Sequence, residues 1–252
     1  MTRSRIAYLS IFLFLILVLA GCSSSQLAPI DPNNGIWDRF FVYPLSFMLD
    51  WFANVLWGEY GLAILVVTII IRFLVLPLTL KQYRSSKAMQ EIQPEMLKIR
   101  EKYKDNPQKV QEETMKLFQK HGVNPMAGCL PILIQMPILI ALYHAIMRNQ
   151  EISTHNFLWM QLGTPDPYFI LPTLAALTTW LQQKVMATQM TPQMQTLMII
   201  FPIMIFVMSM SFASALPLYW IYSNLFTIVQ SYFLYARPKQ NDRSKQKGGL
   251  SK

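Results

Sequence analysis

The feature that most constrains this chain is an apolar run of twenty residues from Gly61 to Leu80, GLAILVVTIIIRFLVLPLTL. As an α-helix this run would be about 30 Å long, which matches the hydrocarbon core of a bilayer. The composition also favours a membrane protein, because 53% of the residues are apolar and only 14% are charged. We therefore predict a first transmembrane helix at residues 61–80.

Three further apolar stretches follow, at residues 125–147, 168–183 and 196–235. The last is far longer than one crossing requires, and the small residues and proline at 211–217 could turn the chain between two helices. We therefore predict transmembrane helices 2 to 5 within residues 125–235. The expected fold class is an all-α polytopic membrane protein with five spans.

The first residues have the pattern of a secretory signal peptide. Arg3 and Arg5 precede an apolar stretch, which ends in the letters LAGC. Small residues followed by cysteine resemble the lipobox of bacterial lipoproteins, in which the cysteine is acylated and becomes the new N-terminus. We expect a signal peptide at residues 1–21 and lipidation at Cys22, with the mature N-terminus outside the cell. An uncleaved N-terminal anchor helix is the alternative.

Positive charge is concentrated in the segments that this topology places in the cytoplasm. With the N-terminus outside, five spans leave residues 81–124, 184–195 and 236–252 inside. These segments hold 17 of the 22 Lys and Arg residues, whereas the outer segments of the mature chain hold only Arg39 and Arg148. The distribution follows the positive-inside rule, so the net charge of +9 is mainly a consequence of orientation.

Residues 22–60 predict a lipidated N-terminus followed by a helix in the outer membrane interface. The expected apolar side consists of Trp37, Phe41, Leu45, Met48, Phe52 and Val55, and the expected polar side of Arg39, Ser46, Asp50 and Asn54. Three tryptophans, Trp37, Trp51 and Trp57, would anchor it. A buried helix of a soluble protein is the alternative.

Residues 81–124 predict an antiparallel helix hairpin in the cytoplasm. Apolar residues recur every three or four positions over residues 89–103, and a second helical run follows. Asn106 suits the N-cap of that second helix, and Pro107 suits its first position. Pro94 requires the first helix to kink there or to begin nearby.

The C-terminal residues 236–252 predict a basic, disordered cytoplasmic tail. Gly248 and Gly249 stand among lysines and arginines, and apolar residues are few. A solvated end, a contact with the lipid surface and a contact with ribosomal RNA all agree with this charge.

Arg72 lies near the middle of the first predicted span, where an arginine costs between about 3 and more than 10 kcal/mol. The predicted spans contain no Asp or Glu, so water, neutral polar groups or an acidic group of another molecule must compensate. Gln135 and Asn224 lie at a similar depth, about ten residues into their spans. We expect these three side chains to line one hydrophilic concavity. The alternative is that Arg72 is a structural residue in a closed core.

Six features, in order, resemble the YidC/Oxa family of membrane protein insertases. They are the lipobox, the arginine in the first span, QYRSSKAMQEIQPEM, FQKHGVNPMAGCLPILIQMPILIALYHAI, FLWMQLG and LPLYWIYSNLF. The resemblance extends from about Ile36 to Tyr235. The form resembled is the short, lipoprotein-type one of Gram-positive bacteria, since the large extracytoplasmic domain of Gram-negative members is absent.

This resemblance implies a fold and a function. Five spans would form a groove open to the cytoplasm and the lipid but closed to the outside, and the hairpin would receive substrates. The substrate-binding groove would include Arg72, Gln135 and Trp220, with Asn224 added from its depth. The protein would insert and chaperone nascent membrane proteins, alone or with the Sec translocon. It would contact the ribosome through the hairpin and tail, and it would also contact membrane lipids.

Other functions have weaker support in the sequence. A small transporter or channel could use Arg72 as an anion site, but internal repeats are not visible. An enzyme is not expected, because the three histidines, His121, His144 and His155, are scattered and show no metal-ligand or nucleophile spacing. We predict no cofactor, no metal site and no specific DNA binding. A purely structural lipoprotein would not explain Arg72.

Overall fold

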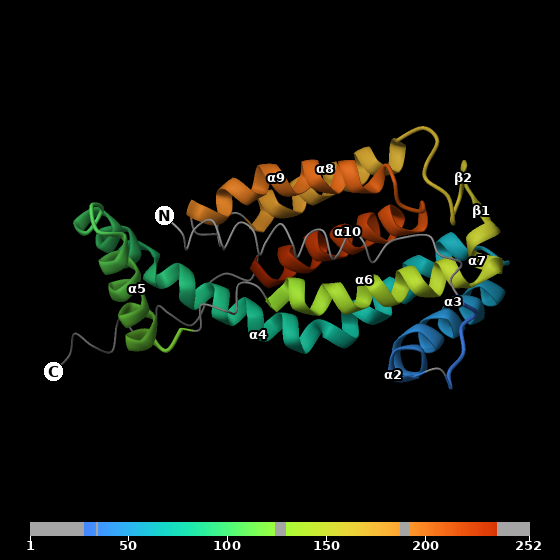
Figure 1. Cartoon of the computed structure of the whole chain (residues 1–252), viewed down its shortest axis with the longest axis horizontal. Helices are drawn as coiled ribbons and strands as arrows, with labels where there is room; N and C mark the ends of the chain where they lie inside the picture. The colour runs from blue at the N-terminus through green and yellow to red at the C-terminus, as the bar shows by residue number, and fades with distance from the viewer. Residues whose placement is uncertain (1–27, 34, 124–129, 187–191, 236–252) are drawn as a thin grey trace.

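The computed structural model describes residues 28–33, 35–123, 130–186 and 192–235 (Figure 1). The expected signal peptide, the lipidation site at Cys22 and the basic tail therefore lie outside the described residues. The helices are α2 (Gly35–Trp37), the π-helical turn η1 (Asp38–Val42), α3 (Tyr43–Val55), α4 (Tyr60–Lys102), α5 (Pro107–His121), α6 (Leu130–Arg148), α7 (Gln150–Thr154), α8 (Ile170–Met186), α9 (Pro192–Ser209) and α10 (Ala215–Tyr235). Two short antiparallel strands, β1 (Asn156–Phe157) and β2 (Met160–Gln161), separate α7 from α8. The mostly helical prediction is confirmed.

Helix α4 is continuous over 43 residues and contains both the first apolar run and the first arm of the hairpin. It does not begin again at Pro94, which lies inside it together with Pro77. Pro94 is exposed, so water can reach the carbonyl that its missing amide leaves unpaired. Within the described residues, α4 is the one helix long and apolar enough to cross a membrane by length and composition, and shorter apolar helices cover Ile134–Arg148 and Ile200–Ser209.

The hairpin of α4 and α5 has a small core of its own. Ile92 and Met96 of α4 are buried against Leu117 and Phe118 of α5. The side chain of Asn106 caps α5 by accepting a hydrogen bond from the Lys109 amide at 3.1 Å, and Pro107 is the first helical residue, as the sequence predicts. The turn chemistry and the apolar spacing together therefore specify this unit.

Helix α10 lies at the centre of the bundle. It packs against α4, α6 and α8, while α9 packs on α8 (Figure 1). The hairpin projects from one end of the bundle, here called the hairpin end. Helices α3 and α7 and the two strands lie at the other end, here called the loop end. The outer surface is apolar, with exposed residues that include Leu74, Leu177, Val207, Val229 and Phe233.

The helix expected in the outer interface is present as α2, η1 and α3, but its polar side has a different role. Ser46 is buried and Asp50 is partly buried, because both accept hydrogen bonds from the Asn149 side chain at 2.9 to 3.1 Å. The exposed side carries aromatic residues, among them Phe47 and Trp51. Ser46 and Asp50 therefore face the protein, whereas Arg39 and Asn54 of the expected polar side are exposed together with the aromatic residues.

Candidate functional site

Arg72 of α4 donates a hydrogen bond to the hydroxyl of Ser223 on α10. Ser223 is buried, and Arg72 retains partial exposure. Among the described residues no carboxylate pairs with Arg72. The positive charge of Arg72 is thus held by a neutral group inside an apolar bundle.

Gln135 of α6 contacts the face of α10 that carries Ser223. Its amide donates a 2.7 Å hydrogen bond to the hydroxyl of Tyr219, which is only 2% exposed. Tyr219 precedes Ser223 by four residues, so the two side chains lie one helical turn apart on one face of α10. The structure therefore brings Arg72 and Gln135 to one polar strip of α10.

Asn224 lies on a neighbouring face of α10, toward α8. Its side-chain amide donates to the hydroxyls of Thr178 at 3.1 Å and Thr179 at 2.8 Å, and Asn224 is 4% exposed. These contacts join α10 to α8 and use the donor capacity of the amide. The hydrogen-bond partners of Asn224 are thus on α8, whereas Arg72 bonds to the neighbouring residue Ser223.

Trp220 and the buried Thr68 have partners other than Arg72. Trp220 packs with Phe201 of α9, with ring centroids 6.3 Å apart. The hydroxyl of Thr68 is buried and donates to the carbonyl of Ile64 in its own helix. Neither makes a recorded polar contact with the guanidinium among the described residues.

Polar side chains continue along α10 from Ser223 toward the hairpin end. Thr227 and Ser231 are buried and repeat at intervals of four residues. Nearby in the sequence of α10, Gln230 has a buried amide nitrogen with no partner in the described part of the chain, and so has the amide oxygen of Gln183 on α8.

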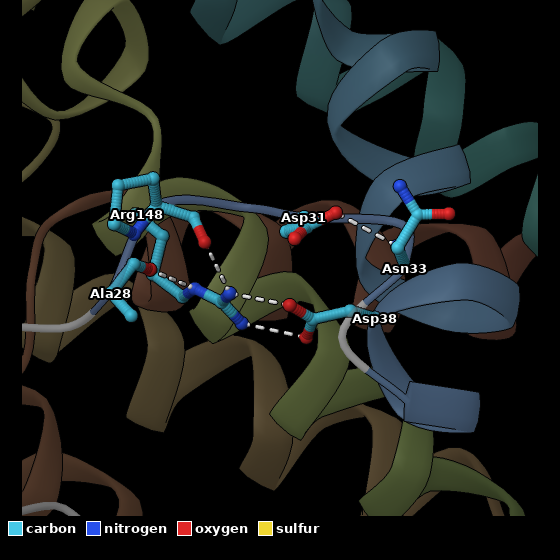
Figure 2. Close-up of polar contacts among 6 residues, drawn as sticks. Ala28, Asp31, Asn33, Asp38 and Arg148 are labelled. Atoms are coloured by element: carbon cyan, nitrogen blue, oxygen red, sulfur yellow. Dashed lines mark hydrogen bonds and ion pairs between the residues drawn. The ribbon is translucent and has the colours of Figure 1, made fainter.

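A second charged cluster, at the loop end, was not predicted from the sequence (Figure 2). Arg148, the last residue of α6, pairs with both carboxylate oxygens of Asp38 at 2.7 and 2.5 Å. It also donates to the carbonyls of Ala28 and Pro29 at 2.6 and 2.8 Å. Hydrogen bonding to Arg148 lowers the pKa of Asp38. The only signal in the sequence was an arginine in an outer segment otherwise poor in positive charge.

The fold and this site define a mostly helical membrane protein with a polar strip inside an apolar bundle. Residues 51–242 match the model of the 60Kd inner membrane protein family, and the chain belongs to that family. The resemblance to the YidC/Oxa insertases drawn from the motifs is thereby confirmed.

Similar proteins and a solved structure support the same family assignment. The chain is 50% identical over 258 residues to the membrane protein insertase MisCA of Bacillus subtilis, covering 99% of each chain. It is 53% identical over 224 residues to the membrane protein insertase YidC 1 of Halalkalibacterium halodurans, covering 87% of each. A crystal structure of an active YidC insertase with its first transmembrane domain resolved matches with a TM-score of 0.64 and 26% identity. That match covers 80% of this chain and 48% of the other.

Proposed function

We propose that this chain is a membrane protein insertase and chaperone. It binds hydrophobic segments of nascent membrane proteins beside a hydrophilic groove and releases them sideways into the bilayer. The names of its relatives support this function. The observation that carries the mechanism is Arg72, a charge inside the bundle whose recorded hydrogen bond goes to the neutral Ser223.

The proposed membrane arrangement has five spans, formed by the first part of α4 and by α6, α8, α9 and α10. The hairpin end is cytoplasmic and the loop end is outside. The lysine and arginine distribution supports this orientation, and the lipobox at Cys22 supports an outer N-terminus held by lipid. The exposed aromatic side of α3 suits the outer membrane interface.

The proposed groove follows the polar strip of α10, from Tyr219 and Ser223 to the hairpin end. Gln135 and Asn224 form part of its wall by holding α6 and α8 to α10. Trp220 supports the wall against α9. Water enters from the cytoplasmic side and shortens the distance over which a polar segment must cross hydrocarbon.

Arg72 draws the acidic outer tail of a substrate into this groove. A guanidinium keeps its charge at any physiological pH and offers several donors in one plane, so it binds carboxylates without a protonation step. The membrane potential, negative inside, then favours outward movement of the acidic tail by roughly 2.3 kcal/mol per charge per 100 mV. Burial of the apolar segment in lipid completes the transfer.

The activity proposed here involves no covalent chemistry, cofactor or metal. The proposed partners are nascent membrane proteins, the Sec translocon and membrane lipids. The hairpin and the basic tail would contact the ribosome, because they form the cytoplasmic face and hold most of the positive charge.

Depletion complementation tests the role of Arg72. Wild type, Arg72→Lys and Arg72→Ala would be compared for insertion of a small phage-coat-like protein with an acidic outer tail. We expect the lysine variant to remain active and the alanine variant to lose activity. A substrate without acidic residues in its tail is the control and should depend less on Arg72.

Equal insertion of the acidic substrate by Arg72→Ala and wild type would show that charge attraction is not the mechanism. Purified protein in liposomes provides a second comparison. Anion flux in the absence of any nascent chain would favour a transporter instead of an insertase.

A further inference from the structure

Tyr60, the first residue of α4, lies between two carboxylates. Its hydroxyl oxygen is 3.0 Å from Oδ1 of Asp50 on α3 and 3.0 Å from Oε2 of Glu151 on α7. Tyr60 itself is only 7% exposed and belongs to the main hydrophobic core. The hydroxyl of this buried tyrosine therefore joins α3, α4 and α7 at the loop end.

One phenol hydroxyl cannot satisfy two ionised carboxylates. It carries a single hydrogen, so it donates to one acceptor only, and an ionised carboxylate has no hydrogen to offer in return. With both groups ionised, the second carboxylate would face a lone pair of the Tyr60 oxygen. A proton on either carboxyl removes this conflict, because that carboxyl then donates to Tyr60 while Tyr60 donates to the other. The geometry therefore fits a pair of carboxyl groups that holds one proton.

Asn149, which lies between α6 and α7, is bonded to the same cluster. Its side-chain nitrogen is 2.9 and 3.1 Å from the two carboxylate oxygens of Asp50. Its side-chain oxygen accepts hydrogen bonds from the backbone amides of Glu151 and Ile152, and so caps α7. Asp50 is therefore connected to α7 by two routes, the Asn149 cap and the Tyr60 hydroxyl.

In the described part of the chain, no Lys or Arg forms an ion pair with either of these two carboxylates. Arg148 of α6 lines the same surface hollow as Asp50, but its guanidinium is bonded to Asp38 and to two backbone carbonyls. Burial raises the pKa of Asp50, and the charge of Glu151 acts in the same direction, against the lowering effect of its hydrogen bonds. The surroundings of the pair therefore favour the retention of a proton.

A histidine is the other titratable group beside Tyr60. The ring of His155 lies edge-on to the Tyr60 ring, with centroids 5.3 Å apart, and its Nε2 is 3.5 Å from a carboxylate oxygen of Glu59. Protonation of His155 would add positive charge beside the two carboxyl groups at low pH. Any test of the pair must therefore separate its titration from that of this histidine.

We propose that Asp50, Tyr60 and Glu151 form a proton-dependent latch, in which one shared proton holds α7 against α3 and α4. Loss of this proton leaves two negative charges at one hydroxyl. The exposed Glu151 side chain then turns to water, which releases α7 from Tyr60. The latch is closed at low pH and opens as the pH at the loop end rises. It does not depend on the proposed groove or on Arg72.

The sign of the pH effect follows from proton linkage. A carboxyl group whose pKa is raised on folding binds more protons in the folded protein than in the unfolded chain, so the unfolding free energy falls as the pH rises. The contribution of the latch is complete below about pH 4, the ordinary pKa of Asp and Glu, and is lost as the pH rises through the raised pKa of the folded state. Asp38 has the opposite effect, because its pKa is lowered.

Thermal unfolding of the full-length protein in nanodiscs tests this linkage between about pH 4 and about pH 8.5. Asp50→Asn replaces the carboxyl by a neutral group of the same shape, whose amide can donate to Tyr60 at every pH, and so keeps the latch closed. Over this range we expect wild type to lose roughly 2–4 °C in melting temperature relative to Asp50→Asn, the change that corresponds to a pKa raised by about one pH unit. Glu151→Gln should give the same result.

Two controls identify the titrating groups. Glu59→Gln removes a neighbouring carboxylate that is not hydrogen-bonded to the Tyr60 hydroxyl, and His155→Gln removes the histidine beside it. The decline in melting temperature should persist in both. A decline that disappears in His155→Gln and persists in Asp50→Asn and Glu151→Gln would belong to the histidine and would overturn the latch.

Hydrogen exchange of the α7 amides reports the opening itself. Wild type and Asp50→Asn are compared at the same pH, so that the chemical exchange rate is equal in both. At about pH 8.5 we expect these amides to exchange about tenfold faster in wild type, and at about pH 4 we expect no difference. If Asp50→Asn did not fold, Glu151→Gln, a change at an exposed side chain, would supply the comparison. Equal exchange at both pH values, with parallel melting curves, would overturn the latch.

Discussion

The guanidinium of Arg148 forms a two-point ion pair with the carboxylate of Asp38, joining the end of α6 to the turn η1 across 110 residues of sequence (Figure 2). Both side chains are only 7% exposed. The carbonyls of Ala28 and Pro29 accept two further hydrogen bonds from the Arg148 guanidinium. This contact attaches residues 28 and 29 to the bundle.

Removing one partner of this pair should destabilise the protein. We expect Arg148→Ala to lower the unfolding free energy by about 3 kcal/mol, the lower end for buried pairs, since the cluster lies near the surface. Thermal unfolding in detergent or nanodiscs would measure this. Arg39→Ala is the control, because Arg39 is exposed and forms no recorded ion pair among the described residues. Equal melting temperatures for Arg148→Ala and wild type would contradict the assignment.

The contribution of Asp38 should depend on pH. Its pKa is lowered in the folded state by hydrogen bonding to Arg148, so the folded protein binds fewer protons there than the unfolded chain. The contribution of Asp38 to the unfolding free energy is therefore fully present at neutral pH. It decreases once the pH falls below about 4 and is lost as the pH passes through the lowered pKa of the folded state. The stability difference between wild type and Asp38→Asn should stay constant from neutral pH to about 5 and shrink in stronger acid. A difference that grows on acidification would rule out this linkage.

Gly61→Ala should disturb the contact between the start of α4 and Phe157 of β1. The new methyl group would overlap the Phe157 ring, and overpacking of this kind costs about 1–3 kcal/mol. A double-mutant cycle with Phe157→Ala measures the coupling. We expect the second change to remove much of the penalty of the first. Fully additive effects would show that the two positions do not interact.

Ser223→Ala should reduce insertion less than Arg72→Ala does. The hydroxyl orients the guanidinium, but the charge remains without it, so a loss of about threefold to tenfold is expected from one hydrogen bond. Complementation with the acidic-tailed substrate measures this, with Ser209→Ala, which changes a buried serine of α9, as the control. A loss as large as that of Arg72→Ala would mean that Ser223 does more than orient the arginine.

Local sequence signals predicted individual elements well. The Asn106-Pro107 pair specifies the start of α5, and the small residues near 211–217 lie where α9 gives way to α10. The long apolar run beginning at Gly61 predicted the apolar first part of α4. These features depend on neighbours within a few residues, so they can be predicted from the sequence alone.

Prediction from the sequence failed where the burial of a side chain depends on partners that are distant in the chain or form only in the folded protein. Ser46 and Asp50 were expected on the solvent side of α3, yet they face Asn149, about a hundred residues later. Nothing in the sequence around Asp166 predicts that its carboxylate is buried. Its three hydrogen-bond donors, on Trp159, Tyr168 and Leu171, come together only when α8 and the turn between β1 and β2 have formed.

The sequence by itself determined which segments are helical, how apolar they are, and that one charge lies within the first apolar run, residues 61–80. Tertiary structure alone decided which side chains meet that charge. Helices such as α6 and α9 are apolar nearly all round, so periodicity does not specify which face turns inward. Only packing sets the rotation of α10 that places Ser223 against Arg72, 151 residues away in the chain.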